Sequence, residues 1–148
     1  MLTVRYRLSI SAAAAVLLGL VVAAASAAPA ARPFDAHFND RACGTGKLCG
    51  TGTVIGFGAV KSELTFGGAA ASPAPGCLGA TGTRTVTLAK DAASTLRLAV
   101  QGAACGPRAW GTFKILSGTG TFAAAKGSGV IWGAPNSLRY YGVLTLTK

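Results

Sequence analysis

The sequence predicts an all-β protein, namely an eight-stranded antiparallel barrel with two disulfides, with a β-sandwich as the alternative. Beyond Pro33, short stretches in which apolar and polar residues alternate are separated by glycine-rich turns. That arrangement is typical of sandwiches and barrels. No stretch of useful length carries the apolar period of a helix. We favour the barrel because closure removes exposed edge strands from so short a chain.

Alternation and turn residues place the expected strands. They cover residues 34–39, 51–60, 62–66, 84–89, 95–101, 110–116, 127–132 and 138–147. The clearest hairpin joins 84–89 to 95–101 through Lys90-Asp91-Ala92-Ala93, because apolar residues alternate with polar or small residues on both sides. A single helical turn is expected near Phe122, and a loop over 67–79.

The first 27 residues have the order of a secretory signal peptide. Arg5 and Arg7 precede an apolar stretch over 8–22, and the small triplet Ala25-Ser26-Ala27 follows. The stretch is rich in Ala and short for a membrane span, although an uncleaved anchor is the alternative. We therefore expect residues 28–148 to be a single secreted domain, extracellular or in the cell envelope, with no transmembrane anchor after cleavage.

The chain is strongly basic, with a formal net charge of +10 from 14 Lys and Arg against four acids. Loss of the leader removes Arg5 and Arg7, and the remaining charge still attracts polyanions. The bases are scattered without clusters or interleaved aromatic residues, so no specific nucleic-acid site is predicted. Anionic envelope polymers, bound weakly, and a small hydrophobic ligand are the expected partners.

All four cysteines, Cys43, Cys49, Cys77 and Cys105, follow the predicted cleavage site. An even count in an exported chain indicates two disulfides. The cysteines lack the close pairing of a zinc site and the chain has one histidine, so no metal is predicted.

Hairpin register predicts which cysteines pair. Val86 and Leu88 must share a face with Leu96 and Leu98, so directly opposed residues must have position numbers of equal parity. A sum of 182 satisfies this condition and sets Val86 opposite Leu96 and Arg84 opposite Leu98. The same sum sets Cys77 opposite Cys105, near the Cα separation of about 5.5 Å that a disulfide favours. Cys43 and Cys49 are then left to each other.

The segment Ser117-Gly118-Thr119-Gly120-Thr121-Phe122-Ala123-Ala124-Ala125-Lys126-Gly127 has the residues of a corner that caps one end of a barrel. Gly118 and Gly120 permit a tight turn, and Phe122 can plug the core. The segment resembles the Gly-Thr-Gly-x-Phe-x-x-Ala-x-Gly stretch of the allene oxide cyclase and dirigent barrels, and of an uncharacterised exported bacterial branch with similar barrels. The resemblance implies an eight-stranded antiparallel barrel and assigns no catalytic residue, because the matched residues are structural.

Catalytic residues are not identified by the sequence. Asp35 and His37 fall on the polar face of the first strand, and no nucleophile in a known motif accompanies them and Asp40. Glu63 is expected to face solvent beside Lys61, and Asp91 to lie in a turn. All four acids are thus assigned to polar strand faces or turns, and we predict that no acid and base with strongly shifted pKa values converge inside the barrel. Gly44-Thr45-Gly46-Lys47 lacks the remaining residues of a phosphate loop, and no cofactor is expected.

Ligand-facing candidates are few. Trp110, Trp132 and Tyr140 could line an apolar or sugar site, although Trp and Tyr are also common in a core or at its rim. Arg84 shares parity with Val86 and is the one charged residue expected inside, unless it lies at a strand end and reaches water.

Three functions are compatible with these features. The leading hypothesis is a non-enzymatic binding or envelope-associated module. A cyclase or isomerase acting on an apolar substrate inside the barrel is the first alternative, and it needs an ionisable group such as Arg84 in a cavity. A carrier for a small hydrophobic ligand is the second, and it needs a roomy barrel with no reactive group.

Overall fold

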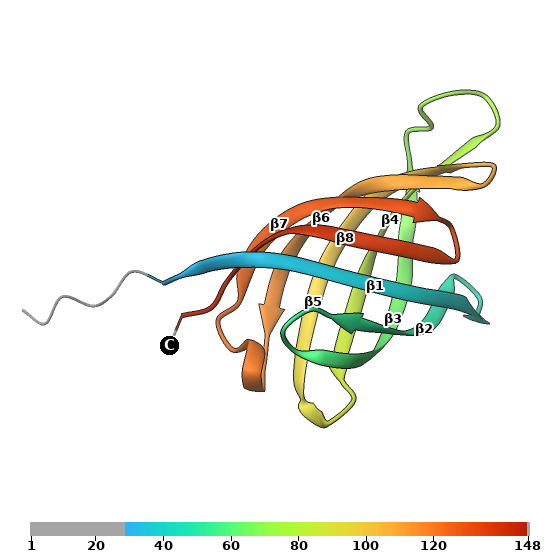
Figure 1. The fold of residues 1–148 in the computed structure, drawn as a ribbon. Coiled ribbons are helices and arrows are strands. Elements are labelled where there is room, and N and C mark those ends of the chain that lie inside the picture. The colour runs from blue at the N-terminus through green and yellow to red at the C-terminus, as the bar shows by residue number, and fades with distance from the viewer. Residues whose placement is uncertain (1–28, 148) are drawn as a thin grey trace, which may run out of the picture.

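The fold is taken from a computed structural model that describes residues 29–147. The predicted signal peptide and its cleavage site lie outside the described residues. Within the described part of the chain, eight β-strands form one closed antiparallel barrel (Figure 1). The all-β prediction and the choice of a barrel over a sandwich are confirmed.

Each strand pairs with its neighbours in sequence, and β8 returns to pair with β1. The strands are β1 (Ala31–Gly44), β2 (Lys47–Val54), β3 (Gly58–Ala70), β4 (Cys77–Leu88), β5 (Asp91–Cys105), β6 (Arg108–Gly118), β7 (Lys126–Ala134) and β8 (Ser137–Thr145). A single 3-10 turn, η1 (Gly120–Phe122), connects β6 to β7. This up-and-down order keeps all connections short and leaves no free strand edge.

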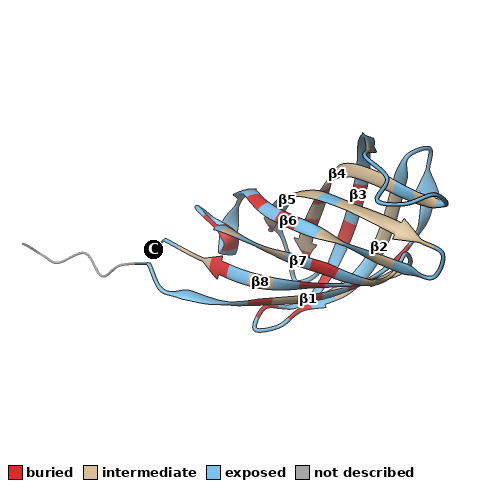
Figure 2. Ribbon diagram, turned by 90° about the horizontal axis from the view of Figure 1, so that it is seen from above, coloured by how far each residue is buried: buried red, intermediate tan, exposed pale blue. Residues whose placement is uncertain are grey.

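Burial alternates along the strands as the sequence pattern requires. In β1 the side chains of Phe34, Ala36 and Phe38 are buried, and the residues between them are more exposed. The same alternation is seen in parts of β3, β4 and β5, and Figure 2 shows buried segments separated by more exposed ones. Because successive side chains point to opposite faces of a strand, one residue set fills the barrel and the other covers its outside.

The strand boundaries differ from expectation at the turn between β2 and β3. We expected one strand over 51–60, but the chain turns at residues 55–57. Gly56 and Gly58 adopt φ values of 82° and 104°, which residues other than glycine rarely adopt. The two glycines therefore place the turn inside the Thr- and Val-rich stretch, and Val60 belongs to the following strand.

Two hairpins are longer than predicted. The strands β3 and β4 extend into the region 67–79 that we expected to be a loop, and only residues 71–76 remain outside the ladder. The turn between β4 and β5 is also tighter, because Asp91 already belongs to β5. The extension of β3 and β4 lengthens one end of the barrel, where their hairpin projects (Figure 1).

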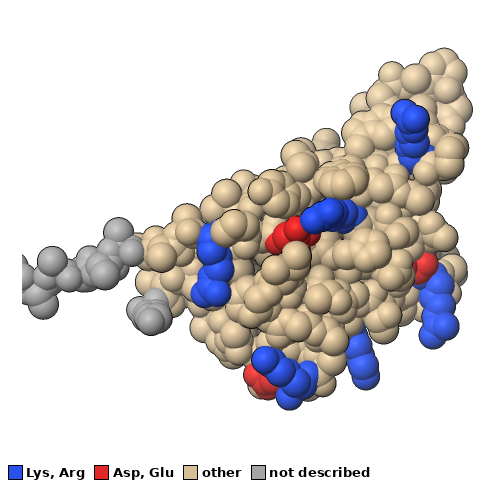
Figure 3. Space-filling model, viewed as in Figure 1, with Lys and Arg blue, Asp and Glu red and all other residues tan. Residues whose placement is uncertain are grey.

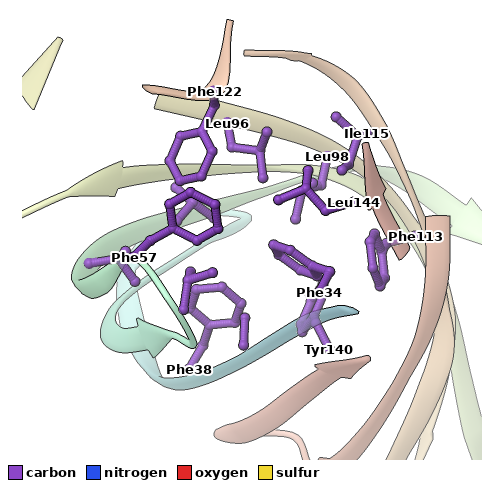
Figure 4. Packing of buried hydrophobic residues seen from close by; sticks show 14 of the residues in the cluster. Phe34, Phe38, Phe57, Leu96, Leu98, Phe113, Ile115, Phe122, Tyr140 and Leu144 are labelled. Atoms are coloured by element: carbon purple, nitrogen blue, oxygen red, sulfur yellow. The ribbon is translucent and has the colours of Figure 1, made fainter. Parts of the chain in front are cut away.

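The opposite end of the barrel is packed with large apolar side chains. Phe57 and Phe122 meet there with ring centroids 4.8 Å apart (Figure 4). Phe122 is fully buried, as the sequence predicted. Phe34 and Phe113, with centroids 5.3 Å apart, continue the packed core toward the middle of the barrel. This half of the barrel is solid.

The corner between β6 and β7 is fastened to the hairpin β4–β5. Thr119 Oγ1 donates to the Ala93 carbonyl at 2.6 Å and accepts from the Thr95 amide at 3.1 Å. The Thr121 amide donates to the fully buried Ser94 hydroxyl at 2.7 Å. These bonds hold Phe122 over the core, so the corner closes this end of the barrel.

Both disulfides form as predicted. Cys77 lies directly opposite Cys105, with Cα atoms 4.4 Å apart, and Cys43 bonds to Cys49. Arg84 lies opposite Leu98, which confirms the register behind the prediction. The two bonds lie at the end of the barrel opposite Phe122, where four of the seven connections between strands are found.

Replacing Phe122 with Ala should destabilise the barrel by about 3–5 kcal/mol, because it removes a fully buried aromatic ring and leaves a cavity. Urea unfolding followed by circular dichroism measures the change. The matched control is Ile55→Ala, whose side chain is exposed and whose loss should change the unfolding free energy by no more than about 0.5 kcal/mol. Equal effects of the two substitutions would show that the corner does not close the core.

Candidate functional site

A pocket of about 340 Å³ opens at the disulfide end of the barrel. Its size falls within the range of small-molecule sites. The side chains that line it are almost all apolar, and they come from seven of the eight strands and the turn after β7. The lining residues are Leu48, Leu64, Phe66, Leu78, Ala80, Thr81, Val100, Gln101, Gly102, Ala103, Ala104, Ala109, Trp110, Ile131, Pro135, Leu138 and Tyr140.

The pocket exists because inward positions at this end carry small residues. Along β5, the inward face carries Leu96 and Leu98 in the packed half, and Val100 is followed by the small residues Gly102 and Ala104 at the pocket. On the flanking strands Ala80 and Ala109 also line the pocket. The same strands therefore fill one half of the barrel and leave the other half hollow.

Gly102 is required where it stands. It lies opposite Gly111 on β6, and a Cβ atom built on Gly102 would lie 3.1 Å from the Gly111 Cα and still closer to the Trp110 carbonyl oxygen. The two strand backbones thus approach too closely for a side chain at this position. A larger residue could not fill the pocket from Gly102 without displacing β6.

Tyr140 forms the floor of the pocket and is 1% exposed. Its ring contacts Phe38 edge-on and Phe113 at a tilt, with centroid distances of 5.1 Å and 5.4 Å. Its hydroxyl accepts a hydrogen bond of 3.0 Å from Arg84 Nε. The tyrosine therefore links the apolar pocket to a buried charge.

Arg84 lies inside the barrel and is fully buried. Its Nη1 donates to Asp40 Oδ1 at 3.0 Å, and its Nη2 donates to Asp40 Oδ2 at 2.6 Å. Nη1 also donates to the Ser62 hydroxyl at 2.8 Å, and the guanidinium lies over the Phe38 ring at 4.5 Å. The bidentate pair with Asp40, together with the bonds to Ser62 and Tyr140, joins β1, β3, β4 and β8 in one polar layer across the barrel.

The position of Asp40 corrects the prediction that no acid and base converge inside the barrel. We assigned all four acids to polar faces or turns, but β1 continues to Gly44 and carries Asp40 to the inward face that Phe38 also occupies. Gly50 lies opposite, and a Cβ atom there would approach Asp40 Oδ1 to 2.5 Å. The glycine thus leaves room for the carboxylate.

Burial and charge act in opposite directions on the groups of this layer. Desolvation lowers the pKa of Arg84, but the hydrogen bonds and charge of Asp40, together with Tyr140, outweigh it and leave the pKa raised. Desolvation raises the pKa of Tyr140 above its ordinary value of 10.0, and the Arg84 charge offsets this only in part. The phenol is therefore neutral, and the guanidinium stays charged and paired.

The two tryptophans proposed as ligand-facing differ in their relation to the pocket. Trp110 and Trp132 are opposed on β6 and β7 and belong to the outer face, with 44% and 50% of their surface exposed. Trp110 still borders the pocket, whereas Trp132 does not line it and packs under the Arg139 guanidinium. Of the four candidates, Tyr140 lines the pocket from inside and Arg84 lies beneath it.

The remaining polar candidates lie on the outside of the barrel. Asp35 forms a bidentate ion pair with Arg139, with distances of 3.0 Å and 2.5 Å, and this hydrogen bonding lowers the pKa of Asp35. His37 Nε2 lies 2.9 Å from the Ser137 hydroxyl. Glu63 is exposed as predicted, but its ion-pair partner is Lys47 at 3.1 Å.

Asp91 has a local role at the start of β5. One carboxylate oxygen accepts from the Ala93 amide at 3.1 Å, and the other accepts from the Ser94 hydroxyl.

Within residues 29–147, no group of three or more His, Cys, Asp or Glu side chains is arranged to hold a metal ion. No helix in that range is long and apolar enough to cross a membrane.

The basic side chains on the face seen in Figure 3 do not form one patch. Figure 3 shows them spread over the visible face, with an acidic group beside some of them. The Arg139–Asp35 and Lys47–Glu63 pairs account for two such neighbours among the described residues. This face therefore carries no local basic patch, although the net positive charge of the protein still attracts anions at long range.

Comparison with known proteins finds no protein-family model, curated protein or solved structure that matches this chain.

Replacing Arg84 with Met should destabilise the protein by about 3–5 kcal/mol, because Asp40 would remain buried without its partner. The double substitution Arg84→Met with Asp40→Leu should cost less than the single one, since it removes both charges. Urea unfolding of the two variants and the wild type makes the comparison. A double variant less stable than Arg84→Met would contradict this account of the pair.

Stability should fall at alkaline pH because of Tyr140. A phenol whose pKa is raised by folding contributes stability fully below its unfolded pKa, near 10, and that contribution is lost as the pH rises through the folded value. The unfolding free energy, measured between about pH 8 and pH 11, should therefore decline less steeply in Tyr140→Phe. Tyr141→Phe removes an exposed tyrosine and is the control. Identical slopes for wild type and Tyr140→Phe would exclude the effect.

Proposed function

We propose that this protein is an exported barrel that binds a small, mostly apolar ligand in the pocket at its disulfide end. The observation that carries the proposal is the pocket itself, about 340 Å³ in volume and lined by apolar side chains. Binding sites for small molecules are commonly concave, mostly apolar and largely preformed. Here the disulfides and the closed strand ladder preform the pocket, so a ligand need not order the chain.

The mouth of the pocket supports the same conclusion. Phe66 and Leu78 belong to its lining, yet they are 42% and 77% exposed. Their neighbour Leu64 lies deeper and is buried. Large apolar groups exposed together at the rim of a cavity are typical of ligand-binding sites, because a bound molecule removes their surface from water.

A cyclase or isomerase receives less support from the same geometry. Neither Arg84 nor Asp40 belongs to the pocket lining, and their charges are committed to each other. The resemblance to allene oxide cyclases and dirigent proteins remains a prediction. Its segment, 117–127, forms the closed end of the barrel, away from the pocket, and therefore has no bearing on the ligand.

Export is supported by the oxidation state of the chain. Both pairs of cysteines are joined, and such bonds persist in oxidising compartments outside the cytoplasm. The order of residues 1–27 is that of a signal peptide. A net positive charge would in addition hold the protein weakly to anionic envelope polymers, which would keep it near the cell surface.

The proposal predicts saturable binding of an uncharged apolar fluorophore. Titration of the secreted protein with N-phenyl-1-naphthylamine should give a one-to-one rise in fluorescence. Ala104→Phe should abolish that rise, because the new ring occupies the pocket that Ala104 lines. The matched control is Ala59→Phe, at an exposed position on β3, which should bind as the wild type does.

Unfolding midpoints of both variants establish that they are folded. Binding by Ala104→Phe at wild-type affinity, or no saturable binding by the wild type, would overturn the proposal.

A further inference from the structure

The hydroxyl of Tyr140 has an unused hydrogen-bond donor. A phenol can donate one hydrogen bond and accept others. The Tyr140 oxygen accepts from Arg84 Nε at 3.0 Å, and within residues 29–147 it donates to no acceptor. Asp40 and Ser62, the acceptors in the same layer, take their bonds from Arg84 instead. The tyrosine proton therefore has no protein partner in the described chain.

The surroundings of Tyr140 make that proton significant. The residue is 1% exposed, and it lines the pocket together with Leu64, Ile131 and Leu138, none of which has a polar side chain. A buried donor left without an acceptor costs more than a typical hydrogen bond contributes. A molecule in the pocket is the available source of an acceptor.

The charge beneath the pocket selects the kind of acceptor. Arg84 is positive, but Asp40 binds it through both carboxylate oxygens and cancels its charge. A ligand carboxylate would enter an apolar cavity without a free counter-charge, and desolvation of such a group is costly. A neutral carbonyl oxygen loses much less hydration and can accept the same bond.

We propose that the ligand is an uncharged apolar molecule whose buried end carries a ketone, aldehyde or ester carbonyl, and that Tyr140 donates a hydrogen bond to this carbonyl. The inference rests on the proposed function and assigns the polar recognition element of the pocket. Arg84 strengthens the bond, because donation from its guanidinium to the phenol oxygen polarises the O–H group. Tyr140 thus acts as the specificity residue and Arg84 positions it.

A matched set of ligands tests the proposal. 2-Acetylnaphthalene and 2-ethylnaphthalene have the same shape, but only the first has a carbonyl, and 2-naphthoate replaces it with a charged carboxylate. Relative to Tyr140→Phe, the wild type should bind the ketone about three- to tenfold more tightly, which corresponds to one hydrogen bond, and it should bind the hydrocarbon with the same affinity. It should bind 2-naphthoate more weakly than the ketone.

Tyr141→Phe, on the outer surface, is the control and should bind both ligands as the wild type does. A second measurement needs no variant: the carbonyl stretch of bound 2-acetylnaphthalene should move to lower wavenumber than in an alkane solvent. A ketone affinity that Tyr140→Phe leaves unchanged, or an unshifted carbonyl band, would overturn the role of Tyr140 while leaving the pocket intact. Failure of both neutral ligands to bind would instead overturn the proposed function.

Discussion

The ion pair between Arg84 and Asp40 is the constraint on which the interior of this barrel depends. Two charges with no exposed side-chain surface are stable only when each is fully hydrogen-bonded. Ser62 and Tyr140 complete the set, so side chains from β1, β3, β4 and β8 must lie at the same height in the barrel. A shift of one residue in β1 or β4 would turn one charge to the outside and leave the other buried and unpaired.

The polar layer also divides the barrel into two unlike halves. On one side, Phe57, Phe122 and their neighbours pack as a dense core that closes the end near the termini (Figure 4). On the other side, small residues such as Ala80 and Ala104 leave a pocket that opens between the disulfides. The dense core and the pocket therefore lie at different ends of the barrel, and under the proposed function the ligand site is separate from the packing that stabilises the fold.

Much of this arrangement is visible in the alternation of the sequence. The register of β4 and β5 follows from matching Val86 with Leu96, and it carries the disulfide between Cys77 and Cys105 with it. The same reasoning could have found Asp40, which continues the inward parity of Phe34, Ala36 and Phe38. It was missed because the strand was expected to end at residue 39. Arg84 could not be named as the partner of Asp40, since parity shows which face of a strand a residue occupies but not its position along the barrel axis.

The pocket was beyond prediction for a related reason. Small inward residues are found in filled barrels as well, and whether they leave space depends on how far large neighbours reach across the closed sheet. Trp110 and Trp132 were attractive candidates because aromatic rings suit apolar ligands. Their position numbers have the opposite parity to those of the inward residues Phe113 and Ile131, however, and this places both tryptophans on the outside. Tyr140 was chosen on the same grounds, and its inward parity makes it the floor of the pocket.

The central claim is that the hollow half of the barrel holds an apolar molecule in the native setting. Native mass spectrometry of the secreted protein, purified from the host that produces it, tests this most directly. The account predicts an additional mass from one uncharged, poorly water-soluble compound, lost when the pocket is filled by Ala104→Phe. A wild-type protein that carries no such compound, and that takes none up from a lipid extract of the same host, would contradict it.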